Sequence, residues 1–599
     1  MSLSLCMIVK NEENALSRCL ESVKDIVDEI ILVDTGSTDN TLEIAKSYGA
    51  KVFYYKWDNS FANARNYSLS KATKDWILIM DADDELVEED KSKVVLLINN
   101  EENKLNAYFG ETLSYSGELK NYNIYSNLNI RFVRNGKGYK FTGDIHEQIT
   151  PGSEDAKKQV FLGLVDIRFY HYGYLNETII EKDKRKRNMS IIENMLKNDP
   201  NNTFMLYNMG VEYSAKGEYS EALKYLNKAY NNFTPTAGFG SKLILKMISC
   251  NEYLNNLNEC LKLIEAGQKY YPSCTEYEFC KANIFYKKRK YLSAIESAKK
   301  CISMGESPVL LREISGIATY KPYYLLGIIA YDLSHYDDAY EYLNKALKIN
   351  SKLTDAFFKI SEILFRNNTE LKEIQNRLES YFDTIDEDTA FLLSKAFYSQ
   401  NEFGLAYYYI NNINSSVENN QKLSFYKGIY LYYLKNYKEA LENLYKVTDE
   451  EYLNTSTYCS ILCALFAKKY EEVDNLINVA KSFNEPEDII IYNSFISLIK
   501  GNSDAILEVN INSESLLQAI FNLLEVLLKG NCLDEFNKAL VLLNHFSDDS
   551  ISLNLGKLYY KYGYLDFSYK EFIKSIKLNE KIDSTSLSIM NSILSIKKS

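Results

Sequence analysis

The fold of the N-terminal region is decided by four short apolar runs: LSLCMIV at residues 3–9, EIILVD at 29–34, KVFYY at 51–55 and WILIM at 76–80. Segments with the apolar spacing of helices separate these runs, at residues 12–24, 38–48 and 61–72. Thr38 is expected to cap the second of them. Strands and helices that alternate in this way form a parallel sheet with helices on both faces. Because residues 106–115 and 129–134 alternate like strands of a mixed sheet, we predict an α/β domain with a mostly parallel, Rossmann-like sheet.

Beyond about residue 188 the strand pattern stops and a set of small residues recurs with gaps of twelve and seven. The sets are Gly210–Ala222–Ala229, Gly327–Ala339–Ala346, Gly428–Ala440–Val447 and Gly556–Ser568–Ser575. A large apolar residue lies four positions after each middle member: Leu226, Leu343, Leu444 and Phe572. Small residues let two antiparallel helices approach closely, and the apolar residue seals their contact. Weaker copies near Cys260 and Ala294 are 34 residues apart, a period that resembles tetratricopeptide repeats. We predict an α/β domain at residues 1–188 and an all-α repeat superhelix at residues 189–599.

Composition excludes several classes of protein. A net charge of −12 argues against a nucleic-acid binder, since no broad basic surface is implied. No stretch reaches the roughly 18 to 20 apolar residues that a membrane span needs. The ten cysteines show no paired spacing, and the start of the chain lacks a basic leader with a cleavage site. A cytoplasmic protein without a transmembrane segment is expected, and its oligomeric state stays open.

Polar residues follow the predicted strands at one edge of the sheet. The runs are Val9-Lys10-Asn11-Glu12, Asp34-Thr35-Gly36 and Asp81-Ala82-Asp83. Ligands of open parallel sheets bind beyond the carboxyl ends of the strands. Two carboxylates one residue apart can hold a divalent ion that neutralises a departing diphosphate. Acidic-x-acidic triplets occur by chance about eleven times at this composition, so the position of Asp81 and Asp83 after WILIM carries the inference. The alternative is a loop that merely caps the next helix.

Residues 3–85 resemble the family 2 glycosyltransferases, which have the fold called GT-A. The matching motifs are SLCMIVKNEENALSRCLESV, IILVDTGSTDNT, FANARN at residues 61–66 and WILIMDADDE. GDIHEQ at residues 143–148 and HYGY at 171–174 resemble the sub-group in which this domain is joined to tetratricopeptide repeats. That sub-group includes bacterial flagellin glycosyltransferases and the peptide S-glycosyltransferases of glycosylated bacteriocins. The resemblance covers the first 230 residues well and is generic beyond them.

The resemblance implies roles in binding a nucleotide-sugar and a Mn²⁺ or Mg²⁺ ion. Asp34 would bond the nucleotide base, Arg65 would lie against the nucleotide, and Asp81 would reach the ribose or a water molecule. Asp83 would ligate the metal, with Asp81 and with His171 near the diphosphate. The rest of the nucleotide rim would comprise Val9, Asn11, Glu12, Gly36 and Ala82. The alternatives are a surface arginine for Arg65 and a half-buried strand histidine for His171.

Enzymes of this family invert the anomeric centre in one displacement, so a carboxylate must take the acceptor proton. Glu147 in the HEQ motif is the candidate base and Asp144 is the second candidate. His146 would orient the acceptor or help to bind the phosphate. The alternative is that His146 and Glu147 are structural residues of a loop.

The resemblance and the repeats together predict transfer of a sugar from a UDP-sugar, with GlcNAc or glucose as the sugar, to a protein side chain. Stacked helix pairs form a long concave surface suited to a protein acceptor, for which Ser/Thr of flagellin is preferred by analogy. The alternatives are an S-glycosyltransferase of a bacteriocin peptide, a transferase acting on a cell-surface glycan or lipid-linked precursor, and a repeat scaffold with a dead catalytic domain. A nucleotidyltransferase is disfavoured because residues 9–14 (VKNEEN) contain no glycine.

Overall fold

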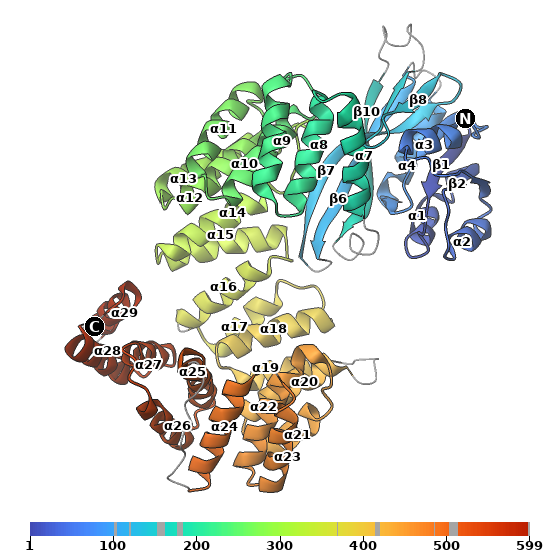
Figure 1. Cartoon of the computed structure of the whole chain (residues 1–599). Helices are drawn as coiled ribbons and strands as arrows, with labels where there is room; N and C mark the ends of the chain where they lie inside the picture. Colours follow the sequence, from blue (N-terminus) through green and yellow to red (C-terminus); the bar gives the residue numbers. More distant parts are fainter. Residues whose placement is uncertain are drawn as a thin grey trace. The chain divides into compact units, whose positions relative to one another are not determined.

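The computed structural model shows an α/β region followed by a long series of helices (Figure 1). It describes residues 1–100, 105–118, 121–151, 162–175, 184–367, 369–413, 420–483, 485–501, 513–580 and 582–596. Contacts between residues divide the chain into two compact units, Met1–Ala356 and Phe357–Ser599. The predicted boundary between residues 188 and 189 lies inside the first unit, and where the catalytic domain ends remains a prediction.

The first unit is built on an eight-stranded mixed sheet with the order β3-β2-β1-β4-β7-β6-β10-β5. Parallel pairing joins β3, β2, β1 and β4, and it also joins β6 to β10. A separate antiparallel pair is formed by β8 and β9. The strands are β1 (Leu3–Val9), β2 (Glu29–Asp34), β3 (Lys51–Tyr54), β4 (Trp76–Ile79), β5 (Asp84–Leu86), β6 (Ala107–Glu118), β7 (Asn121–Arg134), β8 (Tyr139–Thr142), β9 (Gln148–Pro151) and β10 (Leu162–Leu175).

Alternation along β1 produces two cores, one on each face of the sheet. Leu5 on one face packs with residues of α1, α2 and α4, such as Leu20 and Val94. Cys6 on the other face packs with Ala62 of α3. The sheet is therefore covered by helices on both faces, as the alternating pattern predicts. The helices are α1 (Leu16–Val23), α2 (Thr41–Ser47), α3 (Phe61–Leu69) and α4 (Lys91–Asn99), the last preceded by the 3₁₀ turn η1 (Glu88–Asp90).

Two of the predicted strands, at residues 3–9 and 29–34, are confirmed residue for residue. The cap of the second helix was predicted wrongly. Helix α2 begins at Thr41, because the backbone N–H of Thr38 donates to Asn11 Oδ1 at 2.8 Å and so belongs to the preceding loop. Strands β8, β9 and β10 were not predicted, although Val165, Ile167 and Phe169 of β10 alternate with polar residues.

The remainder of the first unit consists of paired helices. The pairs are α8 with α9, α10 with α11, α12 with α13, and α14 with α15. Helix α10 also contacts α8 and α12, and α12 contacts α14, so the first helices of successive pairs form one layer. The bounds are α7 (Lys184–Asn198), α8 (Thr203–Ala215), α9 (Tyr219–Asn232), α10 (Gly240–Tyr253), α11 (Leu257–Tyr270), α12 (Thr275–Lys287), α13 (Tyr291–Met304), α14 (Tyr320–Asp332) and α15 (Tyr336–Ile349).

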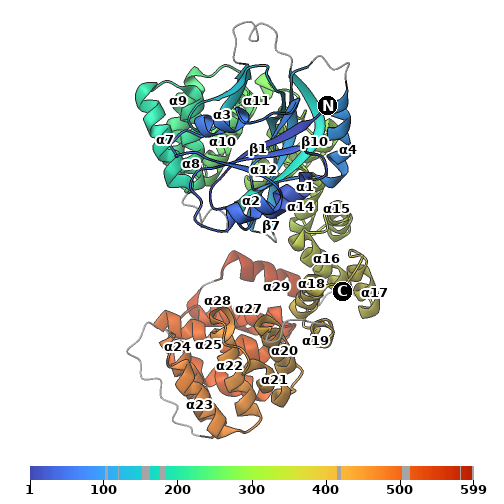
Figure 2. The same cartoon turned by 90° about the vertical axis from the view of Figure 1, so that its right-hand side faces the viewer.

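The second unit is a further series of helix pairs (Figure 2). Among all described residues, no helix is long and apolar enough to cross a membrane. The helices are α16 (Thr354–Arg366, which begins in the first unit), α17 (Leu371–Glu379), α18 (Glu387–Ser399), α19 (Phe403–Asn411), α20 (Gln421–Tyr433), α21 (Tyr437–Leu444), α22 (Glu450–Phe466), α23 (Tyr470–Ala480), α24 (Pro486–Ile499), α25 (Ser513–Lys529), α26 (Leu533–Ala539), η2 (Leu540–His545), α27 (Ile551–Lys561), α28 (Leu565–Asn579) and α29 (Ser584–Ile596).

The small residues of the repeat pattern lie where the two helices of a pair touch. A methyl group added at Gly210 would lie 2.5 Å from Leu226, and one added at Gly327 would lie 2.6 Å from Leu343. The same holds for Gly428 against Leu444, at 2.5 Å, and Gly556 against Phe572, at 2.4 Å. In each pair the apolar residue four positions after the middle small residue fills the space over the glycine. The predicted helix-pair contact is confirmed in all four copies.

This contact predicts the effect of Gly428→Ala. The added methyl collides with Leu444, so the variant should lose about 1–3 kcal/mol of stability despite the better helix propensity of alanine. Gly404→Ala is the matched control, because Gly404 also lies in a helix and nothing is within 4 Å of the added methyl. Urea unfolding monitored by circular dichroism measures both. Equal stability of the two variants would contradict the close approach of α20 and α21.

Candidate active site

The ends of β1 and β2 meet at the carboxyl edge of the sheet. Val9 and Asp34 are register partners, and the N–H of Thr35 donates to the carbonyl of Val9 at 3.0 Å. The buried carboxylate of Asp34 accepts the backbone N–H groups of Gly36, at 3.1 Å, and Ser37, at 3.0 Å. Asp34 therefore shapes the turn after β2 with both of its oxygens.

The loop after β1 is fastened to the same turn. Asn11 has a positive φ of 55° and its backbone N–H donates to Ser37 Oγ at 3.0 Å. A non-glycine residue in this region is held there by its surroundings, and such positions cluster at functional loops. The N–H of Glu12 donates to Thr41 Oγ1 at 2.7 Å. The structure thus brings Val9, Asn11, Glu12, Asp34 and Gly36 together.

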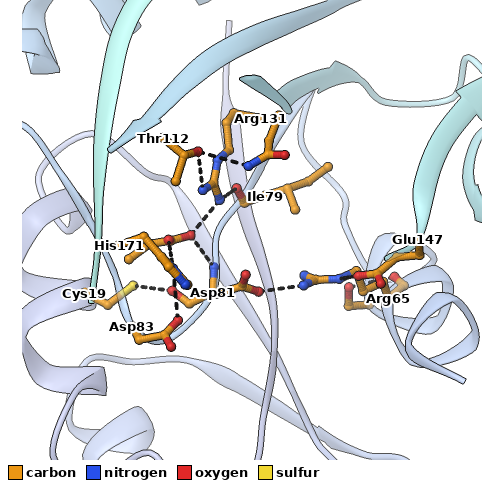
Figure 3. Close-up of polar contacts among 12 residues, drawn as sticks. Cys19, Arg65, Ile79, Asp81, Asp83, Thr112, Arg131, Glu147 and His171 are labelled. Atoms are coloured by element: carbon orange, nitrogen blue, oxygen red, sulfur yellow. Dashed lines mark hydrogen bonds and ion pairs between the residues drawn. The ribbon is translucent and has the colours of Figure 1, made fainter. Parts of the chain in front are cut away.

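The loop after β4 carries an acidic cluster (Figure 3). Asp81, Asp83, Asp84 and His171 each offer one ligand atom, and these atoms lie within 4.8 Å of one another. His171 comes from β10, which pairs with β5 at His171 and Asp84. Ala82, between the first two carboxylates, is buried and holds the turn in the core. The sheet therefore joins Asp84 and His171, which are 87 residues apart in the sequence.

Asp84 is the most deeply buried member of the cluster, and the sequence did not single it out. Its Oδ2 accepts Arg131 Nη1 at 2.6 Å and the backbone N–H of Asp81 at 2.8 Å, while its Oδ1 lies 2.9 Å from His171 Nδ1. Burial alone would raise the pKa of the Asp84 carboxyl, but the Arg131 charge and the His171 hydrogen bond hold it well below its usual value. Thr112 Oγ1 accepts Arg131 Nη2 at 2.9 Å.

His171 is polarised by the carboxylates around it. Burial would lower the pKa of its imidazole, but the charges of Asp83 and Asp84 raise that pKa to about 9. The Nδ1 atom of His171 faces Asp84 Oδ1. A carboxylate behind a histidine in this manner orients histidines that bind metals.

The donor set fits a divalent cation. Carboxylate oxygens suit Mn²⁺ and Mg²⁺, and an imidazole nitrogen is also accepted by Mn²⁺. Asp84 already has three partners, which leaves Asp81, Asp83 and His171 as the residues able to hold the ion. Asp83 is 8% exposed, so a cation there would be shielded from bulk water.

Arg65 connects this cluster to the loop that carries Glu147. Its Nη2 lies 2.6 Å from Asp81 Oδ1 and its Nε lies 2.5 Å from Glu147 Oε1 (Figure 3). Only 13% of the Arg65 side chain and 11% of that of Glu147 are exposed, so Arg65 is not a solvated surface residue. Burial would lower the pKa of Arg65, but the charges of Asp81 and Glu147 raise it further above its usual value. The guanidinium is shared between the acidic cluster and the candidate base.

Residues 144–147, which include Glu147, are held by contacts with α3, α7 and α8. The carbonyl of Asp144 accepts the N–H of Phe61, the first residue of α3, at 2.8 Å, and the Asp144 side chain is exposed. Ile145 packs with Ile192 of α7 and other residues of α7 and α8. These contacts place residues 144–147 between α3, which carries Arg65, and the first repeat helices.

His146 lies in this segment with a positive φ of 51°. Its ring meets the edge of Phe204 of α8 at 6.4 Å between centroids. Enclosure by the protein lowers the pKa of His146 to about 4, although part of its surface still reaches solvent. At neutral pH it is therefore an uncharged imidazole, which can donate or accept one hydrogen bond but cannot neutralise a phosphate.

The fold and the site define a class of protein: an α/β domain of the GT-A type, with an acidic loop at the edge of its sheet, followed by helical repeats. A family model, described as glycosyl transferase family 2, matches residues 4–155. This N-terminal part of the chain is a family 2 glycosyltransferase domain.

Relatives extend the similarity into the repeats. The SPbeta prophage-derived glycosyltransferase SunS of Bacillus subtilis (strain 168) is 30% identical over 284 residues, which are 46% of this chain and 65% of that protein. A TPR repeat-containing protein of Synechococcus elongatus is 28% identical over 269 residues, 44% of this chain and 65% of its own length. The chain thus spans less than two thirds of these relatives. A solved tetratricopeptide repeat protein from Parabacteroides merdae is 13% identical over 43% of this chain and 95% of its own, with a TM-score of 0.28, too low to bear on the fold.

The raised pKa of His171 predicts that Mn²⁺ binding releases protons. At pH 7 the imidazole carries a proton that a metal ligand cannot keep, so Mn²⁺ binding should release about one proton and tighten roughly tenfold per pH unit up to pH 9. Titration calorimetry in two buffers of different ionisation enthalpy counts the protons. His171→Gln should abolish the release. Binding without proton release in the unaltered protein would show that His171 stays protonated and is not a ligand.

Proposed function

We propose that this protein transfers a sugar from a UDP-sugar to a protein side chain with inversion at the anomeric carbon. The observation that carries the proposal is Arg65, whose guanidinium joins the acidic cluster at Asp81 to Glu147. A transferase of this kind needs a donor site and a base on opposite sides of the reacting carbon, and Arg65 spans the two groups of residues. The family 2 match of residues 4–155 and the similarity to a Bacillus subtilis glycosyltransferase support the reaction class.

The donor side is formed by the ends of β1, β2 and β4. The turn that Asp34 shapes and the loop that Asn11 fastens to it would hold the uridine, and Gly36, with φ of 112° and open space around its Cα, allows close approach of a ring. Asp81 and Asp83 with His171 would hold Mn²⁺ or Mg²⁺, which when bound neutralises the departing diphosphate. Arg65 adds a fixed positive charge beside Asp81.

Glu147 is the proposed base. Arg65 bonds Glu147 Oε1, and the hydrogen bonds of the described residues leave the other carboxylate oxygen to accept the acceptor proton. Anchoring through one oxygen holds the carboxylate in one orientation, and a positioned carboxylate is what general-base catalysis requires. Asp144 is the second candidate, since it lies in the same segment and its side chain is exposed. His146, uncharged at neutral pH, would orient the acceptor.

The proposed acceptor is a protein, with Ser/Thr of flagellin preferred and with GlcNAc or glucose as the sugar. The helical repeats support a protein partner, because repeat arrays of this kind present extended surfaces to other chains. A bacteriocin peptide modified at sulfur, or a cell-surface glycan or lipid-linked precursor, is the alternative. A cytoplasmic location is part of the proposal and is supported by the ten cysteines, all of which are unpaired.

The donor half of the proposal predicts metal-dependent UDP release. Purified protein with Mn²⁺ and a panel of UDP-sugars should release UDP from one donor, and Asp83→Asn should reduce that release at least about 100-fold because the ion loses a central ligand. Asp166→Asn is the control, since Asp166 is an exposed carboxylate paired with Lys93. A single-sugar mass gain on added flagellin would identify the acceptor. Absence of UDP binding and turnover with every donor would overturn the proposal in favour of a repeat scaffold.

The acceptor half predicts that Glu147→Gln slows transfer by roughly 10²–10⁴-fold. The amide oxygen of glutamine can still accept from Arg65, so affinity for Mn²⁺ and UDP should change less than threefold. Asp144→Asn is the matched comparison, because it removes the other carboxylate of the same segment. Mass spectrometry of the acceptor gives the transfer rates, and fluorescence titration gives the affinities. The reverse order of effects would assign the base to Asp144.

A further inference from the structure

In the first unit, the first helix of each of three repeats carries a residue at an equivalent position that contacts parts of the unit outside its own helix pair. Counting eighteen residues back from Ala222, Cys260 and Ala294, the equivalent positions of the second helices, leads to Phe204 in α8, Lys242 in α10 and Glu276 in α12. Phe204 meets the ring of His146. Lys242 Nζ donates to Asn127 Oδ1 of β7. These helices form one layer of the repeats, and Figure 1 shows β6 and β7 next to α8.

Glu276 reaches the same strand through the connection between α13 and α14. Its Oε1 accepts the backbone N–H of Glu313 at 2.9 Å, and its Oε2 accepts Ser307 Oγ. Only 2% of Glu276 is exposed. A carboxylate buried to this degree needs its partners, since loss of one leaves an uncompensated charge. The connection is thus fixed to the inner side of α12.

This connection pairs with β7 as a short added strand. The N–H of Ser126 donates to the carbonyl of Glu313 at 3.0 Å, and the N–H of Ser315 donates to the carbonyl of Ile124 at 3.1 Å. Tyr125 and Ile314 are the antiparallel pair between these two bonds. Side by side with them, Arg312 Nη1 lies 3.4 Å from Glu111 Oε1 of β6. Both strands of the β6–β7 hairpin are therefore bonded to the repeats.

The contact is partly shielded from water, since Ser126 is buried and Tyr125, Glu313 and Ile314 are half-buried. Burial raises the pKa of Tyr125 and of the Glu313 carboxyl, and Glu313 Oε2 is a buried oxygen without a hydrogen-bond partner among the described residues. The charges of Lys242 and Lys246 of α10 oppose this rise in the pKa of Glu313. Unsatisfied buried polar groups are costly and persist only where the surrounding packing enforces them. A surface kept free for a partner would leave these groups hydrated.

The inner face of α8, α10 and α12 is the face that carries Phe204, Lys242 and Glu276. We propose that the β6–β7 hairpin permanently occupies this face, and that an acceptor protein binds elsewhere on the molecule. The acceptor part of this inference rests on the proposed function. The repeats of the first unit then serve the active site, because β7 pairs with β4, which leads to Asp81, and β6 pairs with β10, which carries His171. An acceptor that displaced the hairpin would pull on the strands that hold the acidic cluster.

The proposal is tested by locking the hairpin in place with Tyr125→Cys/Ile314→Cys in the full chain. A non-hydrogen-bonded antiparallel pair has Cα atoms about 4.5 Å apart, which suits a disulfide. We expect near-complete disulfide formation under mild oxidation, measured by intact mass, and rates of UDP release and of flagellin modification within twofold of the reduced form. Ile314→Cys alone is the control for effects of the substitution and of oxidation.

Other outcomes overturn the proposal. Failure of the disulfide to form in folded protein would show that the hairpin does not stay on this face. A tenfold or greater loss of flagellin modification on oxidation, restored by reduction, would show that the face must open for the acceptor. A reversible loss of UDP release would likewise show that the hairpin must separate from this face during turnover.

An activity-independent measurement separates this inference from the proposed function. In Tyr125→Cys, the new thiol should react with a maleimide at least tenfold more slowly than the thiol of Leu310→Cys, because Leu310 is 72% exposed in the same connection. The unaltered protein reports background labelling of the native cysteines, of which Cys280 is half-buried and the others are buried. Equal labelling rates would reject a resident hairpin whether or not any sugar is transferred.

Discussion

The ion pair of Arg131 with Asp84 is the interaction on which the catalytic end of the molecule depends. Their side chains are 6% and 0% exposed, so removing either one would leave a buried charge without its main ion-pair partner. Removing one partner of such a pair costs about 3–5 kcal/mol, because the desolvated charge that remains has no compensation. The pair joins β7 to the loop after β4. It fixes which strand lies beside β4 and how the acidic loop leaves the sheet.

This ion pair positions the other residues of the site through individual hydrogen bonds. Asp84 orients His171 with one oxygen and holds the backbone of Asp81 with the other. Asp81 then meets Arg65, and Arg65 meets Glu147. Charges alternate from Asp81 through Arg65 to Glu147, whereas Asp84 and Asp81 carry the same charge and are joined through the Asp81 backbone N–H. The result is a preorganised row of charged residues that begins at Arg131 of β7 and ends at Glu147, in the segment packed against α7 and α8.

Sequence patterns predicted the elements of this structure better than its long-range pairings. Runs such as EIILVD are buried on both faces, and a strand of that kind is legible from composition alone. The repeat contacts were legible too, since a glycine and its covering leucine keep a fixed spacing. Asp84 was passed over because it follows Asp83 in a charged loop, where nothing local distinguishes a buried carboxylate from a solvated one. A signal did exist in Arg131, a charge between the apolar Ile130 and Phe132 of a strand, but its partner is 47 residues away.

The repeats show why a recurring motif is a weak guide to what a surface binds. The glycine positions are equivalent in Gly210 of the first unit and Gly428 of the second, and both are covered by a leucine. Six residues before each lie Phe204, whose ring meets His146, and Lys422, whose ammonium lies 4.2 Å from the ring of Phe391 within its own unit. The pattern that stacks the helices therefore leaves the inner face free to vary, because packing between paired helices does not involve the residues on that face. Whether such a face receives a partner or a part of the same chain depends on contacts that the repeat spacing does not encode.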